Sequence, residues 1–302
     1  PPALAFIEHP PPMLYVKGKT EHFSRPAIGI VGSREASANG ISLAREFATK
    51  LGQAGLTIVS GLARGIDAAA HQASLATGTV AVLAGGIDVV YPPEHKALYD
   101  QIGEAGCIVS EHWPGFTPRA QDFPRRNRIV SGISRGVVIV EAARRSGTLT
   151  TARHAAEQGR VVFAVPGHPR DPRAEGTNHL LKEGATLVLA AEDILEALRP
   201  QLGSAFAESA AGIEPLPPHA EKPIPLTSGI AGPLPQTLGN GDREAIVSAL
   251  GPAPVAVDDL IRSVGLEPRL VQVVLIELAL AGRIERHSGG MVSLRTSSTI
   301  VD

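Results

Sequence analysis

The sequence predicts an α/β protein: an extended Rossmann-like domain with a doubly wound, mostly parallel sheet, followed by a small winged-helix-like domain. Short β-branched runs alternate with helix-like segments between residues 27 and 198, which is the pattern of parallel strands covered by helices on both faces. A proline-rich interval follows, and after it come three short helical patterns and a hairpin pattern. The 302 residues, of which 43% are apolar, are enough for two such units.

Seven runs are apolar along nearly their whole length, as strands buried on both faces require. They cover residues 27–31, 56–59, 79–83, 107–109, 136–140, 161–165 and 186–189. The clearest helices between them are predicted at residues 43–54, 68–76 and 150–158. We expect the Rossmann-like domain to span residues 21–198, after a lead-in of residues 1–20.

The composition changes after this domain. Residues 199–241 contain eight prolines among Gly, Ser and Ala. Proline fixes φ and removes a backbone donor, so we expect a partly extended linker without regular elements.

Residues 242–296 predict a winged helix, and residues 297–302 a tail. Asp258 is placed to cap the second of three helices, and Pro268 to open the third. Six arginines against seven acidic residues give residues 242–295 a net charge of −1. The third helix is almost entirely apolar, so we expect this unit to contact protein or support the fold rather than bind DNA. The expected helices and hairpin strands are residues 242–250, 258–264, 268–281, 283–286 and 291–294.

Composition also bears on location. No stretch approaches the roughly 20 apolar residues that cross a membrane, and the first residues lack the basic and apolar runs of a secretion signal. Cys107 is the only cysteine, so no internal disulfide can form, which fits a reducing compartment. We expect Cys107 to be a small buried strand residue rather than a nucleophile, and the chain to be cytoplasmic without membrane contact.

Positive charge is concentrated in one interval, although the net charge of the chain is −2. Residues 119–153 contain eight arginines and two acidic residues, Asp122 and Glu141, a local balance of +6. Such a cluster is often only a solvated face, but arginine suits bidentate contacts with oxyanions better than lysine does. The cluster therefore favours phosphate binding. Its members are Arg119, Arg125, Arg126, Arg128, Arg135, Arg144, Arg145 and Arg153.

Glycine, serine and arginine gather where the predicted strands end. The carboxyl ends of parallel strands meet at one edge of a sheet, and ligands of open α/β sheets bind there. Glycine lets backbone N–H groups approach an anion, and a helix N-terminus adds a favourable dipole. The edge is therefore predicted to bind phosphates through residues 32–34, 60–67, 84–88, 141–148 and 166–167.

Several well-known ligand and catalytic sites are disfavoured. The sequence has no G-x-x-x-x-G-K-S/T and no G-x-G-x-x-G, which argues against a P-loop NTPase and a dinucleotide enzyme. Asp67 and His71 lie four apart on one helix and could mimic a metal pair, but no third ligand is evident. We expect them to cap and pack the helix, and we expect no cofactor or metal.

The loops together resemble one family. V-G-S-R at 31–34, S-G-L-A-R-G-I-D at 60–67 and F-P-R-R-N-R-I at 123–129 are similar to the DNA-processing protein A family, known as DprA or Smf. The resemblance runs in order from about residue 15 to residue 198, and its motifs are highly specific. It includes Tyr91-Pro92, Ser110-Glu111, V-E-A at 140–142, S-G-T at 146–148, Pro166-Gly167 and Gly184-Ala185.

The resemblance implies a non-enzymatic protein that binds and protects single-stranded DNA and loads the recombinase RecA in natural transformation. A small helical domain often precedes the Rossmann-like domain in this family, and we expect this chain to lack it. Homodimerisation and RecA contact are expected near residues 180–198. Ile194, Leu195 and Leu198 recur there at helical spacing, which fits either an interface or the chain's own core.

Carried onto this chain, the resemblance implies a DNA pocket in which backbone amides and arginines hold phosphates. Phe123 would offer a stacking face, with an ordinary core position equally open. Arg125 and Arg126 cannot both face one pocket if their segment is extended. The implied DNA-binding residues are Ser33, Arg34, Gly61, Arg64, Phe123, Arg126, Asn127, Arg128, Ser146, Gly147 and Thr148, with Lys182 as a further contact.

Two alternatives remain open. Lonely-guy-type nucleotide phosphoribohydrolases share a similar sheet, and their phosphate loop reads P-G-G-x-G-T-x-x-E. Here Thr151 stands where the acid is expected, although Glu141 could still serve as a base. The second alternative is an adaptor that acts only through its C-terminal domain.

Overall fold

The computed structural model describes residues 1–202 and 239–295. Its larger part is an eight-stranded sheet with the order β1-β5-β4-β3-β2-β6-β7-β8. All neighbouring strands in it are parallel except the pair of β1 and β5. The strands are β1 (Tyr15–Gly18), β2 (Ala27–Val31), β3 (Thr57–Ser60), β4 (Thr79–Gly86), β5 (Cys107–His112), β6 (Gly136–Ile139), β7 (Val161–Ala164) and β8 (Thr186–Leu187).

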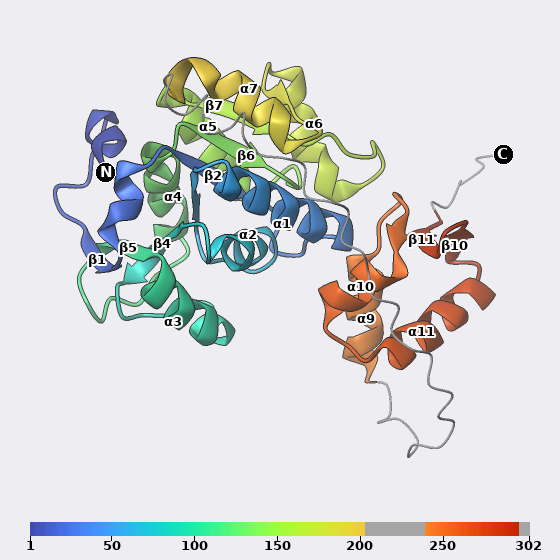
Figure 1. The fold of residues 1–302 in the computed structure, drawn as a ribbon. Helices are drawn as coiled ribbons and strands as arrows, with labels where there is room; N and C mark the ends of the chain where they lie inside the picture. The colour runs from blue at the N-terminus through green and yellow to red at the C-terminus, as the bar shows by residue number, and fades with distance from the viewer. Residues whose placement is uncertain (203–238, 296–302) are drawn as a thin grey trace.

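Helices cover both faces of this sheet (Figure 1). Ile28 and Ile30 pack in one core with α1 (Ala38–Gln53), α2 (Ile66–Ser74) and α7 (Ala191–Leu202). Ala27 and Val31, the alternate residues of the same strand, pack in a second core with α4 (Asp122–Ile133) and α5 (Thr148–Glu157). Because successive strand residues point to opposite faces, a wholly apolar strand contributes side chains to both cores. The predicted doubly wound, mostly parallel sheet is confirmed.

The strand order reverses at β2, which lies between β3 and β6. The loops after β2 and β6 therefore separate at the carboxyl edge, and this is where open α/β sheets hold their ligands. Two further helices complete this domain: α3 (Lys96–Ala105), which packs near β5, and α6 (Glu175–Lys182), which precedes β8.

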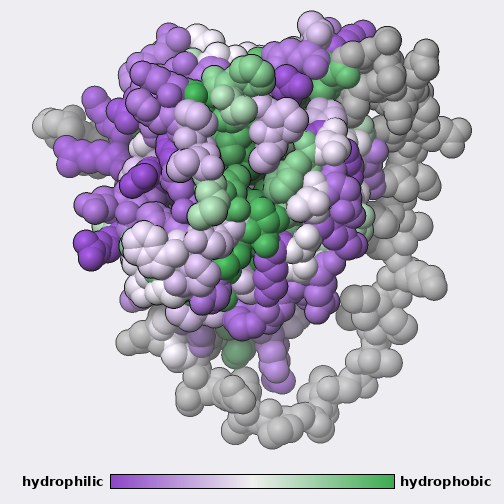
Figure 2. All heavy atoms as spheres, turned by 90° about the vertical axis from the view of Figure 1, so that its left-hand side faces the viewer, coloured by the Kyte–Doolittle hydropathy of each residue, from purple (hydrophilic) through white to green (hydrophobic). Residues whose placement is uncertain are grey.

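The first 20 residues are part of the domain rather than a mere lead-in, which corrects the sequence-based expectation. The short 3-10 helix η1 (Pro2–Phe6) brings Leu4 into the core on the α4 side, and Ile7 is buried there as well. β1 adds an antiparallel edge strand to β5. Figure 2 shows the face with the N-terminal segment, where apolar side chains gather in the middle between hydrophilic flanks.

Helix α7 continues to Leu202 with Pro200 inside it, so the prediction that irregular linker begins at residue 199 is wrong. A proline removes one backbone hydrogen bond, but here it sits in the last turn, where the loss is small and Leu198 is anchored in the core. The remainder of the predicted linker, up to residue 238, lies outside the described residues. No helix in the described ranges is long and apolar enough to cross a membrane.

The C-terminal unit is a winged helix, as expected. Its helices are followed by a hairpin, and a third strand completes a sheet with the order β10-β11-β9. Ala256, not Asp258, occupies the N-cap position of the second helix, and no side chain caps it; Asp258 lies within the first turn instead. The elements are α9 (Asn240–Ala249), β9 (Val255–Ala256), α10 (Val257–Val264), α11 (Pro268–Leu280), β10 (Ile284–His287) and β11 (Met291–Leu294).

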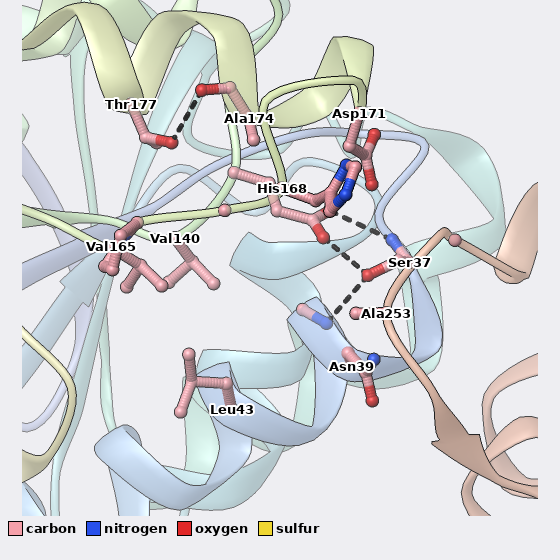
Figure 3. A pocket seen from close by; sticks show the side chains of 15 residues that line it. Ser37, Asn39, Leu43, Val140, Val165, His168, Asp171, Ala174, Thr177 and Ala253 are labelled. Carbon is pink, nitrogen blue, oxygen red and sulfur yellow. Dashed lines mark hydrogen bonds between the residues drawn. The ribbon is translucent and has the colours of Figure 1, made fainter. Parts of the chain in front are cut away.

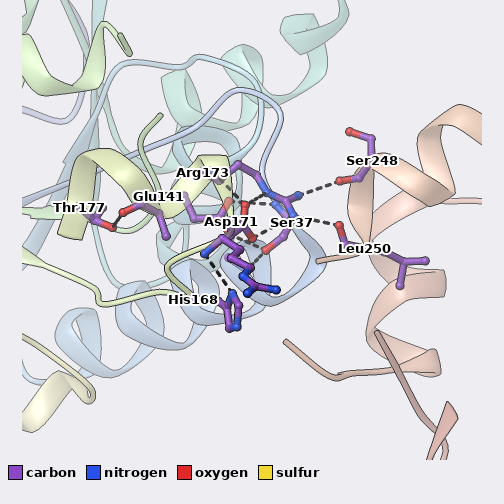
Figure 4. Close-up of polar contacts among 11 residues, drawn as sticks. Ser37, Glu141, His168, Asp171, Arg173, Thr177, Ser248 and Leu250 are labelled. Carbon is purple, nitrogen blue, oxygen red and sulfur yellow. Dashed lines mark hydrogen bonds and ion pairs between the residues drawn. The ribbon is translucent and has the colours of Figure 1, made fainter. Parts of the chain in front are cut away.

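Arg173 joins the two units (Figure 4). Its guanidinium donates hydrogen bonds to the main-chain oxygens of Ser248, at 2.8 Å, and Leu250, at 2.9 Å, at the C-terminal end of α9. The carboxylate of Asp171 holds the same guanidinium at 3.1 and 3.2 Å. A cation at a helix C-terminus is favoured because the last carbonyls lack partners. The winged helix is therefore held against the Rossmann-like domain by a directed contact.

Replacing Arg173 by alanine should loosen this contact. Hydrogen bonds of charged groups contribute about 1.5–3 kcal/mol, so we expect Arg173→Ala to increase the radius of gyration in small-angle X-ray scattering. Arg170→Ala removes an exposed neighbouring arginine and is the control, with no expected change. An unchanged scattering curve for Arg173→Ala would contradict the assigned role.

Candidate nucleic-acid interface

A cavity of about 740 Å³ opens at the carboxyl ends of the central strands. Its walls come from the loops after β2, β3 and β6, from the start of α4 and from the start of α5. Three of the five segments predicted to bind phosphates contribute to it, namely residues 32–34, 60–67 and 141–148, whereas residues 84–88 and 166–167 do not line it. Among its lining residues are Ser33, Arg34, Ala63, Tyr91, Phe123, Asn127, Arg145, Ser146, Gly147 and Thr148.

Two of the loops are packed so closely that only glycine fits. Gly65 has φ +70°, and a Cβ there would lie 2.3 Å from the carbonyl oxygen of Ser33. The Ile66 amide donates to that same oxygen at 3.2 Å. Leu62, fully buried, has a positive φ of 57°, an uncommon conformation for leucine that the surrounding contacts must hold in place. The loop after β3 is therefore a rigid wall.

Arg126 lies beneath these loops. Its side chain donates to the carbonyl oxygen of Gly61 at 2.6 Å and to that of Val82. Asp67 accepts from the amides of Gly61, at 3.0 Å, and Ala63, at 3.4 Å. The main chain of Gly61 is thus held on both sides by buried charged groups. A Cβ at Gly61 would lie 2.5 Å from the guanidinium, which explains the glycine.

The burial of these two groups shifts their pKa values in opposite directions. Burial lowers the pKa of Arg126 to about 10, against the attraction of Asp67. Burial also raises the pKa of Asp67, against the attraction of Arg126 and the bonds from the loop amides. Arg126, expected to hold a phosphate, is only 7% exposed. The structure gives it a positioning role in the floor of the cavity.

Two cations remain available at the mouth of the cavity. Arg34 is exposed, and its guanidinium carbon lies 5.4 Å from the ring centroid of Phe123. Arg145 is exposed in the loop before α5. Within residues 1–202 and 239–295, neither has an ion-pair partner. These two side chains are the ones free to meet an anion.

The turn before α5 forms the opposite wall. The Thr148 hydroxyl donates to the carbonyl oxygen of Gly32 at 3.0 Å, which ties this turn to the loop after β2. The Ser146 hydroxyl accepts from the Thr148 amide at 3.2 Å, and Asn127 donates to the Gly147 carbonyl at 3.3 Å. Because α5 begins here, its positive dipole end faces the cavity.

Phe123 lies in the wall of the cavity rather than in the core. It is half-buried and packs against Tyr91, with ring centroids 5.2 Å apart. Tyr91 belongs to a sequence motif and Arg145 to the predicted phosphate-binding segment 141–148, but neither is among the DNA-binding residues that the family resemblance implies. Nothing in a linear pattern shows which members of a cluster face a cavity.

The arginine cluster is divided by the fold. Of its eight members, only Arg126 and Arg145 line the cavity. Arg128 is 2.5 Å from Glu111, and Arg125 is 3.7 Å from the same carboxylate. Arg125 and Arg126 lie in the helix α4 rather than in an extended segment, so their side chains point in different directions. The net charge of +6 counted over residues 119–153 leaves out Glu111, which precedes this interval in the sequence but pairs with two of its arginines.

Other expected residues lie at the rim or elsewhere. Arg64 borders a small hollow beside Arg34 but is paired with Glu94. Lys182 is exposed at the end of α6 and does not line the cavity. Ile194 and Leu198 are fully buried in the core beside α1, and Leu195 packs against it. The stripe considered for a dimer contact is therefore the chain's own core.

The remaining titratable groups near the sheet have structural roles. His71 bonds the Thr79 hydroxyl at 2.7 Å, and burial lowers its pKa to about 3, so the ring is neutral near pH 7. Asp67 accepts hydrogen bonds from the amides of Gly61 and Ala63 instead. Burial raises the pKa of the Cys107 thiol to about 11, which fits a buried strand residue.

Glu141 holds the residue that caps a helix. The Ser37 hydroxyl donates to Glu141 at 2.5 Å and the Ser37 amide donates to it at 2.9 Å. Ser37 is the N-cap residue of α1, and its hydroxyl accepts from the Gly40 amide. Glu141 lines a separate hollow of about 160 Å³ between the two units, with His168 and Ala253 (Figure 3). Thr151 is buried at the base of the large cavity. These positions disfavour the phosphoribohydrolase alternative.

The role assigned to Arg126 can be measured by unfolding. Leaving a buried acceptor without its donor costs about 1–3 kcal/mol, and Arg126→Met removes the donor from the carbonyl oxygens of Gly61 and Val82. Arg126→Met should therefore lower the free energy of unfolding in urea by at least about that amount. Arg125→Met changes the exposed neighbour and should shift it by less than about 0.5 kcal/mol. Equal stability of both variants would show that Arg126 does not support the loops.

Comparisons with known proteins agree with this architecture. The model of the family described as DNA recombination-mediator protein A matches residues 1–199, and that of the DprA winged helix domain matches residues 231–290. Protein Smf of Escherichia coli is 40% identical over 300 residues, covering 98% of this chain and 75% of the relative. DNA processing protein DprA of Streptococcus pneumoniae is 44% identical over 194 residues, covering 64% of this chain and 68% of the relative.

Two solved structures are similar as well. The X-ray structure of DprA from Streptococcus pneumoniae has a TM-score of 0.63 at 43% identity, covering 65% of this chain and 70% of that one. A structure of DNA processing protein A from Helicobacter pylori has a TM-score of 0.63 at 29% identity, covering 67% of this chain and 93% of that one. With its two family domains in order and its strand-end cavity in place, the chain belongs to the DprA/Smf family.

Proposed function

We propose that this chain is a non-enzymatic protein that binds single-stranded DNA in the strand-end cavity, protects it, and passes it to RecA during natural transformation. The observation that carries the proposal is the cavity itself. It combines Arg34 and Arg145, which have no ion-pair partner in the described residues, with the ring of Phe123 and the start of α5. The two arginines and the start of α5 suit phosphates, and the ring of Phe123 suits a nucleobase.

Single-stranded rather than duplex DNA fits this cavity. Few free cations line it, and the net charge of the chain is −2, so phosphate attraction alone is weak. Contact between a base and Phe123 adds binding only where bases are not already paired and stacked. The solved relative from Helicobacter pylori is described by its single-stranded DNA binding mode, which supports the same ligand here.

The absence of catalysis is part of the proposal. Glu141 is committed to the N-terminus of α1, and Asp67 is held by the amides of Gly61 and Ala63. A general base must instead reach the proton that it removes. We place the protein in the cytoplasm, where a single buried thiol, Cys107, needs no oxidised partner.

Fluorescence anisotropy should show tighter binding to a labelled single strand than to the duplex of the same sequence. Binding should weaken with salt, because each phosphate neutralised on a single strand contributes a slope of about −0.7 in a log–log plot. Arg34→Ala should reduce affinity roughly tenfold or more and make the slope shallower, since charge-assisted hydrogen bonds contribute about 1.5–3 kcal/mol.

Arg153→Ala is the matched control for Arg34→Ala. Arg153 is an exposed arginine outside the cavity, paired with Glu157 at 3.6 Å. Its loss should leave affinity within about twofold, roughly 0.4 kcal/mol. Equal binding of duplex, or equal losses in the two variants, would contradict the proposed site.

We further propose that the chain forms a homodimer through the β8 edge of its sheet. β8 is an outer strand with unpaired backbone groups along one side. Leu187 is 50% exposed and Leu189 67% exposed on this edge. These residues lie in the segment expected for dimerisation, and they replace the buried Ile194 and Leu198 as the interface side chains.

Light scattering at micromolar concentration should give twice the chain mass of 31.4 kDa. Leu187→Glu with Leu189→Glu should give the single-chain mass, because two carboxylates would lose solvation in the interface. Leu280→Glu alters an exposed leucine of the winged helix and should stay dimeric. A monomeric wild-type protein would exclude this interface.

RecA is the proposed recipient of the DNA, which membership in a family of recombination mediators supports. Adding this chain should shorten the lag of RecA assembly on single strands already covered by a single-stranded DNA-binding protein, followed by RecA ATP hydrolysis. Arg34→Ala should lose the effect in proportion to its loss of DNA binding. An unchanged lag at saturating wild-type protein would rule out a mediator role.

A further inference from the structure

Three aromatic rings form a small surface where β5 ends. His112 and Phe116 are stacked, with centroids 4.0 Å apart and an interplanar angle of 11°. Trp113 stands nearly perpendicular to Phe116, at 5.2 Å and 74°. Trp113 is 61% exposed, so most of this residue is open to solvent. We name His112, Trp113 and Phe116 the aromatic ledge.

The ledge is held rigid by the end of β4. The Phe116 amide donates to the Trp113 carbonyl oxygen at 3.2 Å, and the Gly86 amide donates to the Phe116 carbonyl oxygen at 2.8 Å. The Gly115 amide donates to Asp88 at 2.7 Å. A surface whose main chain is already ordered loses little conformational freedom when a ligand binds. The rings are therefore both exposed and held in a fixed position before a ligand binds.

The same loop leads directly into the DNA cavity. Pro118 and Ala120, a few residues beyond the ledge, line that cavity. The strand order β5-β4-β3-β2 separates the ledge from the loop after β2 by three strand spacings, about 14 Å in all. Arg119 lies between Pro118 and Ala120 in the sequence and is exposed, and no ion pair in the described part of the chain includes it.

We propose that the aromatic ledge stacks nucleobases of the same DNA strand whose phosphates occupy the cavity, with Trp113 as the principal contact. This proposal rests on the proposed function. Alternating aromatic faces and arginines are what sequence-independent binding of single strands requires, because every base has a π-face. Trp113, Arg119 and Phe123 follow one another along the chain segment that leads from the ledge to the cavity and supply that alternation, and the bound strand would run from β2 toward β5.

Trp113 is the only tryptophan of the chain, so its fluorescence reports on the ledge alone. Titration with unlabelled oligothymidines of increasing length should quench the emission once the strand is long enough to reach from the cavity to the ledge. The quenching should saturate at the concentration at which anisotropy shows binding to be complete. Duplex DNA should not quench it, because its bases are already stacked.

Variants separate stacking from charge. Trp113→Ala should weaken binding of long oligothymidines about tenfold, or ~1.4 kcal/mol, and leave short ones unaffected. Trp113→Tyr should restore most of the loss. The log–log salt slope should stay unchanged in Trp113→Ala, since no phosphate contact is lost. Phe6→Ala is the control, because Phe6 is an exposed aromatic residue of η1 that does not line the cavity.

The outcomes distinguish the ledge from the proposed function. Tight anisotropy binding with unchanged tryptophan emission, or equal affinities of Trp113→Ala and wild type for long strands, would overturn the ledge alone. Failure of the wild-type protein to bind any single strand would overturn both. Circular dichroism of Trp113→Ala would confirm that a lost affinity comes from a folded protein.

Discussion

The buried guanidinium of Arg126 is the constraint on which the site depends. A charge beneath a sheet edge is tolerated only if it is fully partnered, and here the partners are the carbonyls of Gly61 and Val82 with Asp67 nearby. Those partners determine the path of the loop after β3, exclude a side chain at Gly61, and set the floor on which the cavity rests. Arg126, which is expected from the sequence to bind DNA, thus supports the loops whose other residues face the cavity.

The distribution of charge follows from the same arrangement. Acidic residues from other elements neutralise several arginines, as Glu111 does for Arg128 and Glu94 for Arg64, so the cavity keeps only a few free cations. Amides at the start of α5 and aromatic rings supply the remaining affinity. A site of this composition selects ligands that offer both a phosphate and an accessible base face, rather than any polyanion.

Much of the fold could be predicted from the sequence, because all seven apolar runs became strands and the glycine-rich turns fell at one edge. The antiparallel β1 was missed, since it is short and largely exposed and has no run of apolar residues. Helix α4 was not recognised because it carries three arginines, of which Arg126 is buried, and its buried apolar residues Ile129, Val130 and Ile133 come only in its second half. The loops of the site could be predicted from their residue types. Which arginines are already bound, as Arg126 and Arg128 are, and which stay free, as Arg34 and Arg145 do, could not be predicted, because the binding carbonyls and carboxylates lie far away in the chain.

The Arg173 contact has a consequence for how the two units could diverge. The guanidinium recognises main-chain oxygens of Ser248 and Leu250, and such oxygens are present whatever side chains the helix carries. The contact at Arg173 therefore requires only that a helix of the C-terminal unit ends at this position. The outer surface of the winged helix, including the exposed Ile276 and Leu280, is left to change its binding specificity in evolution without loss of attachment.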